Sequence, residues 1–349
     1  MSIFQSTNDL HQSMDLLSKS TPSYRKAYSD RTSWFMACAS ELAYRKFNPP
    51  KVSEKQIELL EKVLLKVAPK NKKALLKLLQ LFEYDNEQEL KQMCEDLVIL
   101  KAELVRTFDN EDTQAILIRT REFLVLSFRG TESNSWADIK TDFDAKLISC
   151  RTNGRVHSGF YAAFEKVEGE ILNALNESEH NLLPLFITGH SLGGALATVA
   201  AKLITHTGGN AACYTFGSPR VADDDWLMEM KTCVYRVVNA ADGVTLVPLR
   251  GSTLQIVAWI LRLIPVVGKP IRDWLLKHLF GYLHAGDMRF LSTIEPGAYQ
   301  NARLLTHVDI VYRARALINR LSPFKSVLTD HYIAVYRRKL AAIALQRNR

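Results

Sequence analysis

The segment over residues 185–204 constrains the fold more than any other part of the 349-residue chain. Its apolar start, 185–188, predicts a buried strand, and the small residues of 193–204 predict a helix. Between them stands the pentapeptide Gly-His-Ser-Leu-Gly, whose glycines permit the sharp turn and close backbone approach of a strand–turn–helix unit. The segment therefore predicts that Ser191 is presented as a nucleophile at the carboxyl edge of a sheet. An idle serine in a tight glycine turn is the alternative.

Strand-like and helical runs alternate around this segment. Apolar, β-rich runs predict strands over 113–119, 123–128, 211–216, 234–239 and 288–291, and helices are predicted over 30–46 and 223–230. Such alternation predicts an α/β fold with a largely parallel central sheet.

Three stretches differ in character from this alternating core. Residues 1–29 are polar and predict a loose arm, so a single domain is expected over 30–349. Leucine- and lysine-rich residues over 53–105 predict two or three helices, which form a helical insertion or cap with a packing role. A second, apolar helical insertion is expected over 252–281.

The composition is that of a globular protein, with 47% hydrophobic and 23% charged residues, and it excludes disordered and fibrous classes. Five cysteines without a C-x-x-C pair make a disulfide framework or a zinc site unexpected. The first residues lack the basic and apolar regions of a signal peptide, and no apolar run reaches the ~18 residues of a membrane span. We therefore expect a cytoplasmic or peripheral membrane protein, with signal-independent export as the alternative.

A serine hydroxyl becomes a nucleophile only when a base takes its proton and an acid orients that base. After a serine elbow of this kind, the acid and then the histidine follow in chain order. Asp242 follows the predicted strand 234–239 in a glycine-containing loop, the kind of place where functional groups are commonly found. The rival acidic run 223–225 has the character of an exposed helix start. Asp242 is therefore the expected acid.

Three histidines follow late enough in the chain to serve as the base, namely His284, His307 and His331. Their spacing alone does not choose between them. His190, inside the pentapeptide, is expected to pack against the fold.

Acyl transfer also needs backbone N–H groups that bind the developing oxyanion. One donor is expected from Leu192, directly after the serine, and the other from a loop after an earlier strand. The strand predicted over 123–128 ends in Arg-Gly-Thr, and this glycine lets the loop turn an N–H toward the serine. Thr131 is therefore the second expected donor, with an ordinary turn as the alternative.

Taken together, these segments resemble the class 3 lipase family, the fungal-type triacylglycerol lipases with plant and bacterial relatives. The matching blocks stand in family order at 128–131, 156–160, 188–194, 215–221 and 236–239 with Asp242. The resemblance extends over 30–46 and 113–340. It implies an α/β-hydrolase fold with a mostly parallel central sheet and a lid, to which residues 53–105 add the expected helical N-terminal cap or insertion.

The resemblance also implies which histidine is the base. The family's catalytic histidine lies near the C-terminus in an Asp-His pair, which is matched here by His331 and the aspartate before it. The family's Tyr-x-His-x-Gly block, matched at 282–286, does not hold the catalytic histidine. Ser191, Asp242 and His331 are therefore the implied triad.

The resemblance implies a serine carboxylester hydrolase that acts on lipid esters through an acyl-enzyme, with no metal or organic cofactor. Phospholipase or acyltransferase activity on the same machinery, or a non-catalytic lipid-binding scaffold, are the alternatives. Trp136, Ile139 and Phe143 form an apolar helical stripe where the family has its lid, although the first aspartate follows the tryptophan by two places instead of three. A lid over Ser191 is therefore expected.

Two features bear on partners. Residues 254–280 combine apolar helical faces with prolines and glycine, and they predict either an interfacial hairpin that enters lipid or a cap packed on 53–105. Residues 250–349 carry 16 basic and 5 acidic side chains, which favours an anionic lipid surface or, equally, a solvated helical face. No basic run is interleaved with aromatic residues, so nucleic acid is not an expected partner.

Overall fold

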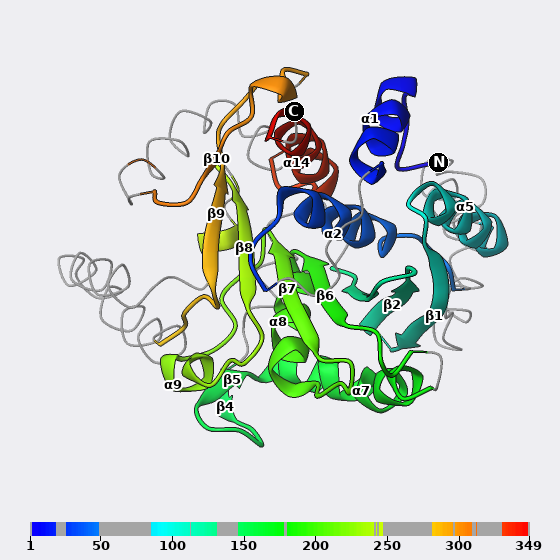
Figure 1. Cartoon of the computed structure of the whole chain (residues 1–349). Coiled ribbons are helices and arrows are strands. Elements are labelled where there is room, and N and C mark those ends of the chain that lie inside the picture. Colours follow the sequence, from blue (N-terminus) through cyan, green and yellow to red (C-terminus); the bar gives the residue numbers. More distant parts are fainter. Residues whose placement is uncertain are drawn as a thin grey trace, which may run out of the picture.

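The computed structural model describes residues 2–18, 26–48, 85–111, 113–130, 146–177, 180–240, 242, 244–246, 281–295, 297–308, 312 and 330–347. Within these residues, one central sheet carries helices on both of its faces (Figure 1).

The central sheet has eight strands among the described residues. In spatial order they are β1 (Glu103–Asn110), β2 (Thr113–Arg119), β3 (Leu124–Phe128), β6 (Leu185–His190), β7 (Asn210–Phe216), β8 (Val234–Asn239), β9 (Asp287–Leu291) and β10 (Leu304–Leu305). The pairs from β3 to β9 are parallel, and the strands at each edge pair antiparallel. The expected mostly parallel sheet is confirmed, and the carboxyl ends of β3, β6, β7 and β8 therefore lie along one edge.

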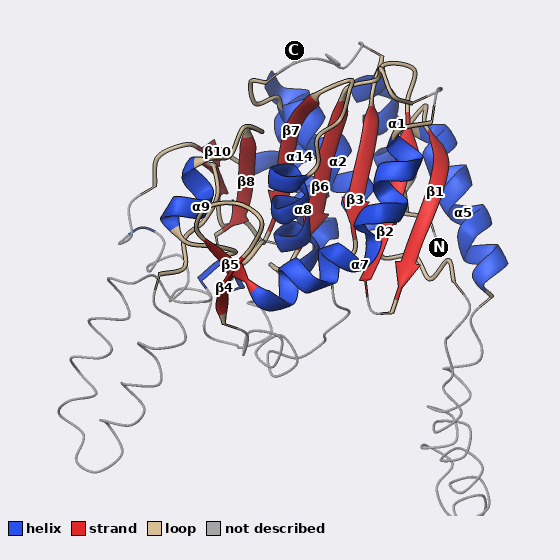
Figure 2. Cartoon of the chain, turned by 90° about the horizontal axis from the view of Figure 1, so that it is seen from below, coloured by secondary structure: helices blue, strands red, loops and turns tan. Residues whose placement is uncertain are grey.

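Helices cover both faces of this sheet (Figure 2). One face carries α2 (Asp30–Leu42) and α14 (Ile333–Arg347), with α1 (Thr7–Leu17) and α5 (Asn86–Ile99) beside them, and the other face carries α7 (Ser158–Leu175) and α8 (Leu192–Leu203). Shorter elements are α9 (Asp224–Met228), the hairpin of β4 (Leu147–Ser149) with β5 (Arg155–His157), and the 3-10 turns η1 (Val244–Leu246) and η2 (Tyr299–Asn301).

Side chains alternate between the two faces along the central strands, because successive residues of a strand point to opposite sides. In β2, Ile116 and Ile118 join the cluster under α2 and α14, whereas Ala115 and Leu117 join the cluster under α7 and α8. Every residue of β3 and β6 is buried. A parallel strand covered on both faces is mostly apolar, which explains the apolar run over 185–187 that leads to Ser191.

Helix α2 is seated on the middle of the sheet by buried hydroxyl groups. The hydroxyls of Ser40 and Thr188 lie 3.0 Å apart, and Thr188 also donates to the carbonyl of Tyr214 at 2.8 Å. Ser127 of β3 donates to the carbonyl of Ala39 at 3.1 Å. Because each of these buried hydroxyls has a partner, the polar seam between helix and sheet does not destabilise the core.

The N-terminal residues differ from the loose polar arm that the sequence predicts. Residues 7–17 form α1, and the hydroxyl of Ser6 caps the helix by accepting from the backbone of Asp9 at 3.0 Å. Ile3 and Phe4 are buried in the same cluster as α2 and α14. The backbone N–H of Ile3 donates to the carboxylate of Asp96 on α5 at 3.1 Å. A few spaced apolar residues anchor this segment, although its average composition is polar.

Strand β1 also differs from the expectation that residues 53–105 are helical to their end. The helix α5 does form, but the chain reverses at Lys101, whose φ is 55°, and β1 begins at Glu103. The strand is an edge strand in which Glu103 and Arg106 are exposed and only Phe108 is buried, so its apolar pattern is weak. Residues 53–84 of this insertion lie outside the described residues, as do 252–280 of the second insertion.

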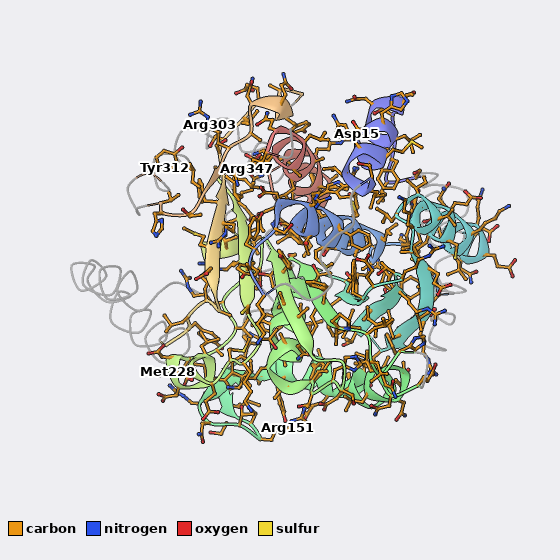
Figure 3. The ribbon with its side chains drawn as sticks, viewed as in Figure 1. Asp15, Arg151, Met228, Arg303, Tyr312 and Arg347 are labelled. Atoms are coloured by element: carbon orange, nitrogen blue, oxygen red, sulfur yellow. The ribbon has the colours of Figure 1, made fainter. Side chains whose placement is uncertain are left out.

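The described surface carries charged side chains and a few isolated apolar ones. Arg151 and Met228 lie at the periphery near α9 and the β4–β5 hairpin (Figure 3). Isolated exposed apolar side chains of this kind are normal on globular proteins. In the described part of the chain, no helix has the length and apolarity to cross a bilayer.

Candidate active site

Ser191 stands at the turn between β6 and α8, as the sequence predicts. Its backbone has φ 57° and ψ −128°, values that a residue with a side chain rarely adopts. Its N–H donates to the carbonyl of Phe216 on β7 at 2.9 Å, and the residue is buried. A strained, well-anchored turn of this kind is the geometry of a nucleophile elbow.

The glycines around Ser191 stand where no side chain fits. A Cβ at Gly189 would lie 2.2 Å from the carbonyl oxygen of Gly193, and one at Gly193 would lie 2.3 Å from that of Phe128. A Cβ at Gly130 would lie 3.2 Å from the Cβ of Ser191. The glycines therefore let the end of β3 and the start of α8 approach each other closely beside the serine.

Ser191, His331 and Asp242 form one hydrogen-bonded run. The Nε2 atom of His331 is 2.9 Å from Oγ of Ser191, and its Nδ1 atom is 2.8 Å from Oδ2 of Asp242. Because a carboxylate only accepts, Nδ1 carries the proton and Nε2 accepts from the serine hydroxyl. The side chain of Asp242 is wholly buried and that of His331 is 13% exposed. The structure thus brings together all three sequence-predicted residues, from the end of β6, the loop after β8 and the segment before α14.

Further donors hold the carboxylate of Asp242. Its Oδ1 atom accepts from the backbone N–H of Val244 at 3.0 Å, and its Oδ2 atom accepts from the hydroxyl of Tyr336 at 2.6 Å. Tyr336 itself accepts from the backbone N–H of Asn239 at 2.9 Å, so its own proton is directed to the carboxylate. Burial, and then the charge of Asp242, raises the pKa of Tyr336 well above its usual value. Tyr336 therefore stays protonated and remains a donor.

Gly217, just past the end of β7, leaves room for the pair of Asp242 and His331. Its φ is 58°, and a Cβ there would lie 2.5 Å from Oδ2 of Asp242 and 3.1 Å from the ring of His331. Glycine adopts this left-handed conformation without strain. Both the backbone conformation and the lack of a side chain are therefore needed here.

His190 lies beneath the site as a second, structural histidine. Its Nε2 atom is 2.6 Å from the backbone carbonyl of His331, and its Nδ1 atom is 2.8 Å from the hydroxyl of Tyr44. Burial, followed by the effect of His331, lowers the pKa of His190 well below its usual value, so the ring is neutral. Nε2–H therefore donates to His331, and Nδ1 accepts from Tyr44. The expectation that His190 packs against the fold fits this placement.

The structure places the rival candidates elsewhere. The Nε2 atom of His284 lies 2.8 Å from the carbonyl of Thr245, where it braces the loop that holds the acid. His307 is exposed. Asp223, from the rival acidic run, caps α9 and forms an ion pair with Arg155 at 2.9 Å. None of these three side chains contacts the serine hydroxyl among the contacts of the described residues.

The two expected oxyanion donors differ in how far the structure describes them. Leu192 is the first residue of α8, so its N–H is one of the four that have no acceptor within the helix. Thr131 lies outside the described residues, which end just before it at Gly130. The expected lid residues Trp136, Ile139 and Phe143 also lie outside them.

This arrangement supplies a nucleophile, a base and a carboxylate that orients the base. Across the described ranges, no group of three or more His, Cys, Asp or Glu residues is placed to hold a metal ion.

Sequence reasoning missed two hydroxyl groups that support the site, those of Tyr44 and Tyr336. Tyr44 lies 146 positions from its partner His190, and Tyr336 lies 94 positions from Asp242. Neither position carries a distinctive local pattern. Only the folded arrangement, or an alignment of relatives, could have identified them.

In a comparison with known protein families, residues 125–252 match the family described as Lipase (class 3). The secreted mono- and diacylglycerol lipase 1 of Fusarium solani is 34% identical over 134 residues, which are 37% of this chain and 40% of that protein. The chloroplastic phospholipase A(1) DAD1 of Arabidopsis thaliana is 32% identical over 162 residues, which are 40% of this chain and 36% of that protein. The match thus spans well under half of the length of these relatives.

A solved structure extends the likeness over most of the chain. Lipase II from Rhizopus niveus superposes with a TM-score of 0.50 and 20% identity, covering 87% of this chain and 92% of that one. At this level of identity the likeness establishes the fold, which confirms the expected α/β-hydrolase architecture. The class 3 lipase resemblance is confirmed over the matched segment.

Proposed function

We propose that this chain, which carries a class 3 lipase segment over residues 125–252, is a serine carboxylester hydrolase that acts on lipid esters. One observation carries the proposal, namely the hydrogen-bonded run from Ser191 through His331 to Asp242, with distances of 2.9 and 2.8 Å. A buried serine at a strained turn, joined to a histidine and a carboxylate, has the geometry of acyl transfer through a covalent intermediate.

In the proposed reaction, the oxygen of Ser191 attacks the ester carbonyl carbon while Nε2 of His331 takes the hydroxyl proton. Asp242 holds the imidazole in the required tautomer and stabilises the imidazolium that forms. His331 then gives the proton to the departing alcohol, and an acyl-enzyme remains. Water, deprotonated by His331, attacks this ester and releases the fatty acid and the free serine.

We propose the N–H groups of Leu192 and Thr131 as the donors that bind the oxyanion of the tetrahedral intermediate. The position of Leu192 at the first turn of α8 supports this assignment, because the helix dipole adds a partial positive charge there. A Cβ at Gly130 would lie 3.2 Å from the Cβ of Ser191, and this close approach supports the loop after β3 as the second contributor. Removal of one such donor commonly costs about 100- to 1,000-fold in kcat.

We propose glycerolipid esters as the substrate class. The Fusarium relative is named as a mono- and diacylglycerol lipase, and the Arabidopsis relative as a phospholipase A(1). Both classes of compound contain the same acyl ester, so phospholipase specificity or acyl transfer to an alcohol uses the same three side chains and stays as the alternative.

We further propose that Trp136, Ile139 and Phe143 form a lid over Ser191, and that residues 254–280 and the basic C-terminal third contact a membrane or droplet surface. The apolar stripe and the charge balance of the sequence support both assignments. We propose a location in the cytoplasm or on the surface of a membrane, with signal-independent export as the alternative. A sharp rise in hydrolysis when a short-chain ester passes its solubility limit would support the lid.

The test uses the purified protein and its Ser191→Ala variant, each incubated with mixed vesicles of diacylglycerol and phosphatidylcholine. Mass spectrometry of the products should detect fatty acid release by the wild type, and the depleted lipid would name the substrate. The Ser191→Ala variant should release none. Ser149→Ala, an exposed serine on β4, is the matched control and should retain full activity.

Release by neither protein, with and without a detergent interface, would refute the hydrolase. Vesicle binding without hydrolysis would instead favour the lipid-binding scaffold, and a labelled alcohol that captures the acyl group would reveal a transferase.

A further inference from the structure

Lys339 on α14 is a lysine without solvent contact. Its side chain is 0% exposed, although lysine is almost never fully buried unless it is paired. Its Nζ atom donates to Oδ1 of Asn239 at 2.6 Å and to the carbonyl of Ser292 at 3.0 Å, and it lies 4.0 Å from Oδ1 of Asp330. The cation therefore joins three segments, namely the end of β8, the residue after β9 and the residue before His331.

Asn239 connects Lys339 to the backbone segments that carry His331 and Asp242. Its Oδ1 atom accepts from Lys339 and from the backbone N–H of Ala240 at 3.1 Å, and its Nδ2 atom donates to the carbonyl of Asp330 at 2.8 Å. Its own carbonyl accepts from the N–H of Asp242 at 3.1 Å. One wholly buried side chain thus holds the backbone beside the histidine and the start of the loop that carries the acid.

A buried cation is rarely the most stabilising choice at a wholly buried position. Replacing a buried ionic contact with well-packed apolar residues is often neutral or stabilising, because charges lose their hydration when they are buried. The groups that the Lys339 cation holds in place explain its position. Asn239 fixes the backbone of Asp330, which directly precedes His331, and the backbone of Asp242. The hydrogen bond that these two segments must form joins Nδ1 of His331 to Oδ2 of Asp242.

We propose that Lys339 is a positioning residue for the triad, which acts through Asn239 to hold His331 against Asp242. It touches neither the serine nor the substrate. The inference deepens the proposed hydrolase function and rests on it. A displacement of about 1 Å in such a site commonly costs on the order of 100-fold in rate, so loss of the anchor should reduce turnover strongly.

The same helix offers a matched control. Arg337 is also a buried cation of α14, but its Nε atom pairs with Glu41 on α2 at 2.5 Å and its Nη2 atom donates to the carbonyl of Ile3. Arg337→Met therefore removes a buried charge from α14 without touching the two loops of the triad. Lys339→Met removes the anchor of those loops with a side chain of similar length.

Both variants are assayed on a soluble short-chain ester, with kcat and KM measured. Lys339→Met should lower kcat roughly 100-fold with KM unchanged, because the histidine and the carboxylate lose the anchor that holds them in place. Arg337→Met should lower the melting temperature and leave kcat near the wild-type value.

A second variant covers the case in which Lys339→Met does not fold. Asn239→Asp keeps an acceptor for Lys339 but removes the donor to the carbonyl of Asp330 at 2.8 Å and to its Oδ1 atom at 3.3 Å. It should fold and give the same kinetic signature as Lys339→Met. Equal kcat losses in Lys339→Met and Arg337→Met, or an unchanged kcat in a folded Lys339→Met or Asn239→Asp, would overturn the proposal.

A spectroscopic readout separates this proposal from the hydrolase assignment. The Nδ1–H proton of His331 is held by Asp242, so it should give a resolved downfield signal in the proton NMR spectrum of the wild type and of Arg337→Met. The signal should weaken or vanish in Lys339→Met. If the wild type hydrolyses no ester, the proposed function fails, and this signal still decides whether Lys339 positions the pair.

Discussion

The hydroxyl of Tyr44 lies 2.8 Å from Nδ1 of His190 and thereby joins the segment after α2 to the end of β6, the residue before Ser191. His190 continues the contact to the backbone carbonyl of His331 at 2.6 Å. The same hydroxyl would lie 2.3 Å from a Cβ at Gly130. A single tyrosine therefore contacts both the elbow and the loop that leads to Thr131.

Tyr44→Phe is expected to reduce kcat while the fold is retained. Removing one partner of a buried hydrogen bond costs about 1–3 kcal/mol, because Nδ1 of His190 is left without its donor. We expect a loss of roughly 10-fold in kcat on a soluble ester, with little change in KM. Tyr161→Phe, on α7 at the other face of the sheet, is the control and should match the wild type. Equal rates in both variants would mean that the contact does not support the site.

Asp242→Asn should nearly abolish hydrolysis without unfolding the protein. An amide cannot fix the imidazole in the tautomer that leaves Nε2 free to accept from Ser191, so kcat should fall roughly 10,000-fold. Steady-state kinetics on a soluble ester, with circular dichroism to verify folding, checks this expectation. Asp223→Asn, which removes an acid from the rival run, should affect α9 and leave kcat near the wild-type value. The reverse order of effects would move the acid to the other site.

Gly217→Ala should damage the site through a single methyl group. The new Cβ would stand 2.5 Å from Oδ2 of Asp242, and alanine would also strain a backbone with φ 58°. We expect kcat to fall at least 10-fold and the free energy of unfolding to fall by about 1–3 kcal/mol.

Gly169→Ala is its matched control, because Gly169 lies inside α7 and a Cβ there would have no heavy atom within 4 Å apart from its own turns of helix. That variant should gain up to about 1 kcal/mol of stability and keep full activity. Urea unfolding curves and ester hydrolysis measured on both variants decide between a local and a general effect of the added methyl group.

The folded protein should lose stability as the pH falls below about 6.5, the ordinary pKa of histidine in an unfolded chain. Burial lowers the pKa of His157 to about 4, and burial also lowers that of His190. Between these values the unfolded chain binds more protons than the folded one, so stability rises with pH there. His157 alone should account for a loss of up to about 3 kcal/mol between pH 7 and pH 4.

Urea unfolding at pH 7, 5.5 and 4.5 measures this loss. His157→Gln should lower stability at pH 7 and flatten its dependence on pH, whereas His307→Gln, at an exposed position, should leave the slope unchanged. A slope for His157→Gln equal to that of the wild type would assign the acid sensitivity to other groups.

The parts of the fold that rest on local patterns were predictable from the sequence. The turn around Ser191 and the strands on both sides of it follow from turn chemistry and from apolar runs that lie within about ten residues. Asp242 followed from its place directly after a strand. The edge strand β1 was missed, because its alternating pattern is weak where one face is exposed.

The choice among three histidines could not be made from spacing, because it depends on which loop folds back onto the serine. His331 lies 140 positions from Ser191, and only the family resemblance singled it out. The supporting groups Tyr44, Asn239 and Lys339 were not predicted at all. Their roles arise from contacts between helices and loops that are adjacent only after folding.

The residues of the triad lie far apart along the chain, and this separation makes the site one of the last parts of the protein to form during folding. Its two hydrogen bonds join residues 140 and 89 positions apart, and Arg337 reaches the carbonyl of Ile3 across 334 positions. Contacts of such long range form slowly, because large loops must close before any of them contributes. After dilution from urea, recovery of helical signal should therefore precede recovery of ester hydrolysis, and the interval between the two curves would time the docking of α14 onto the sheet.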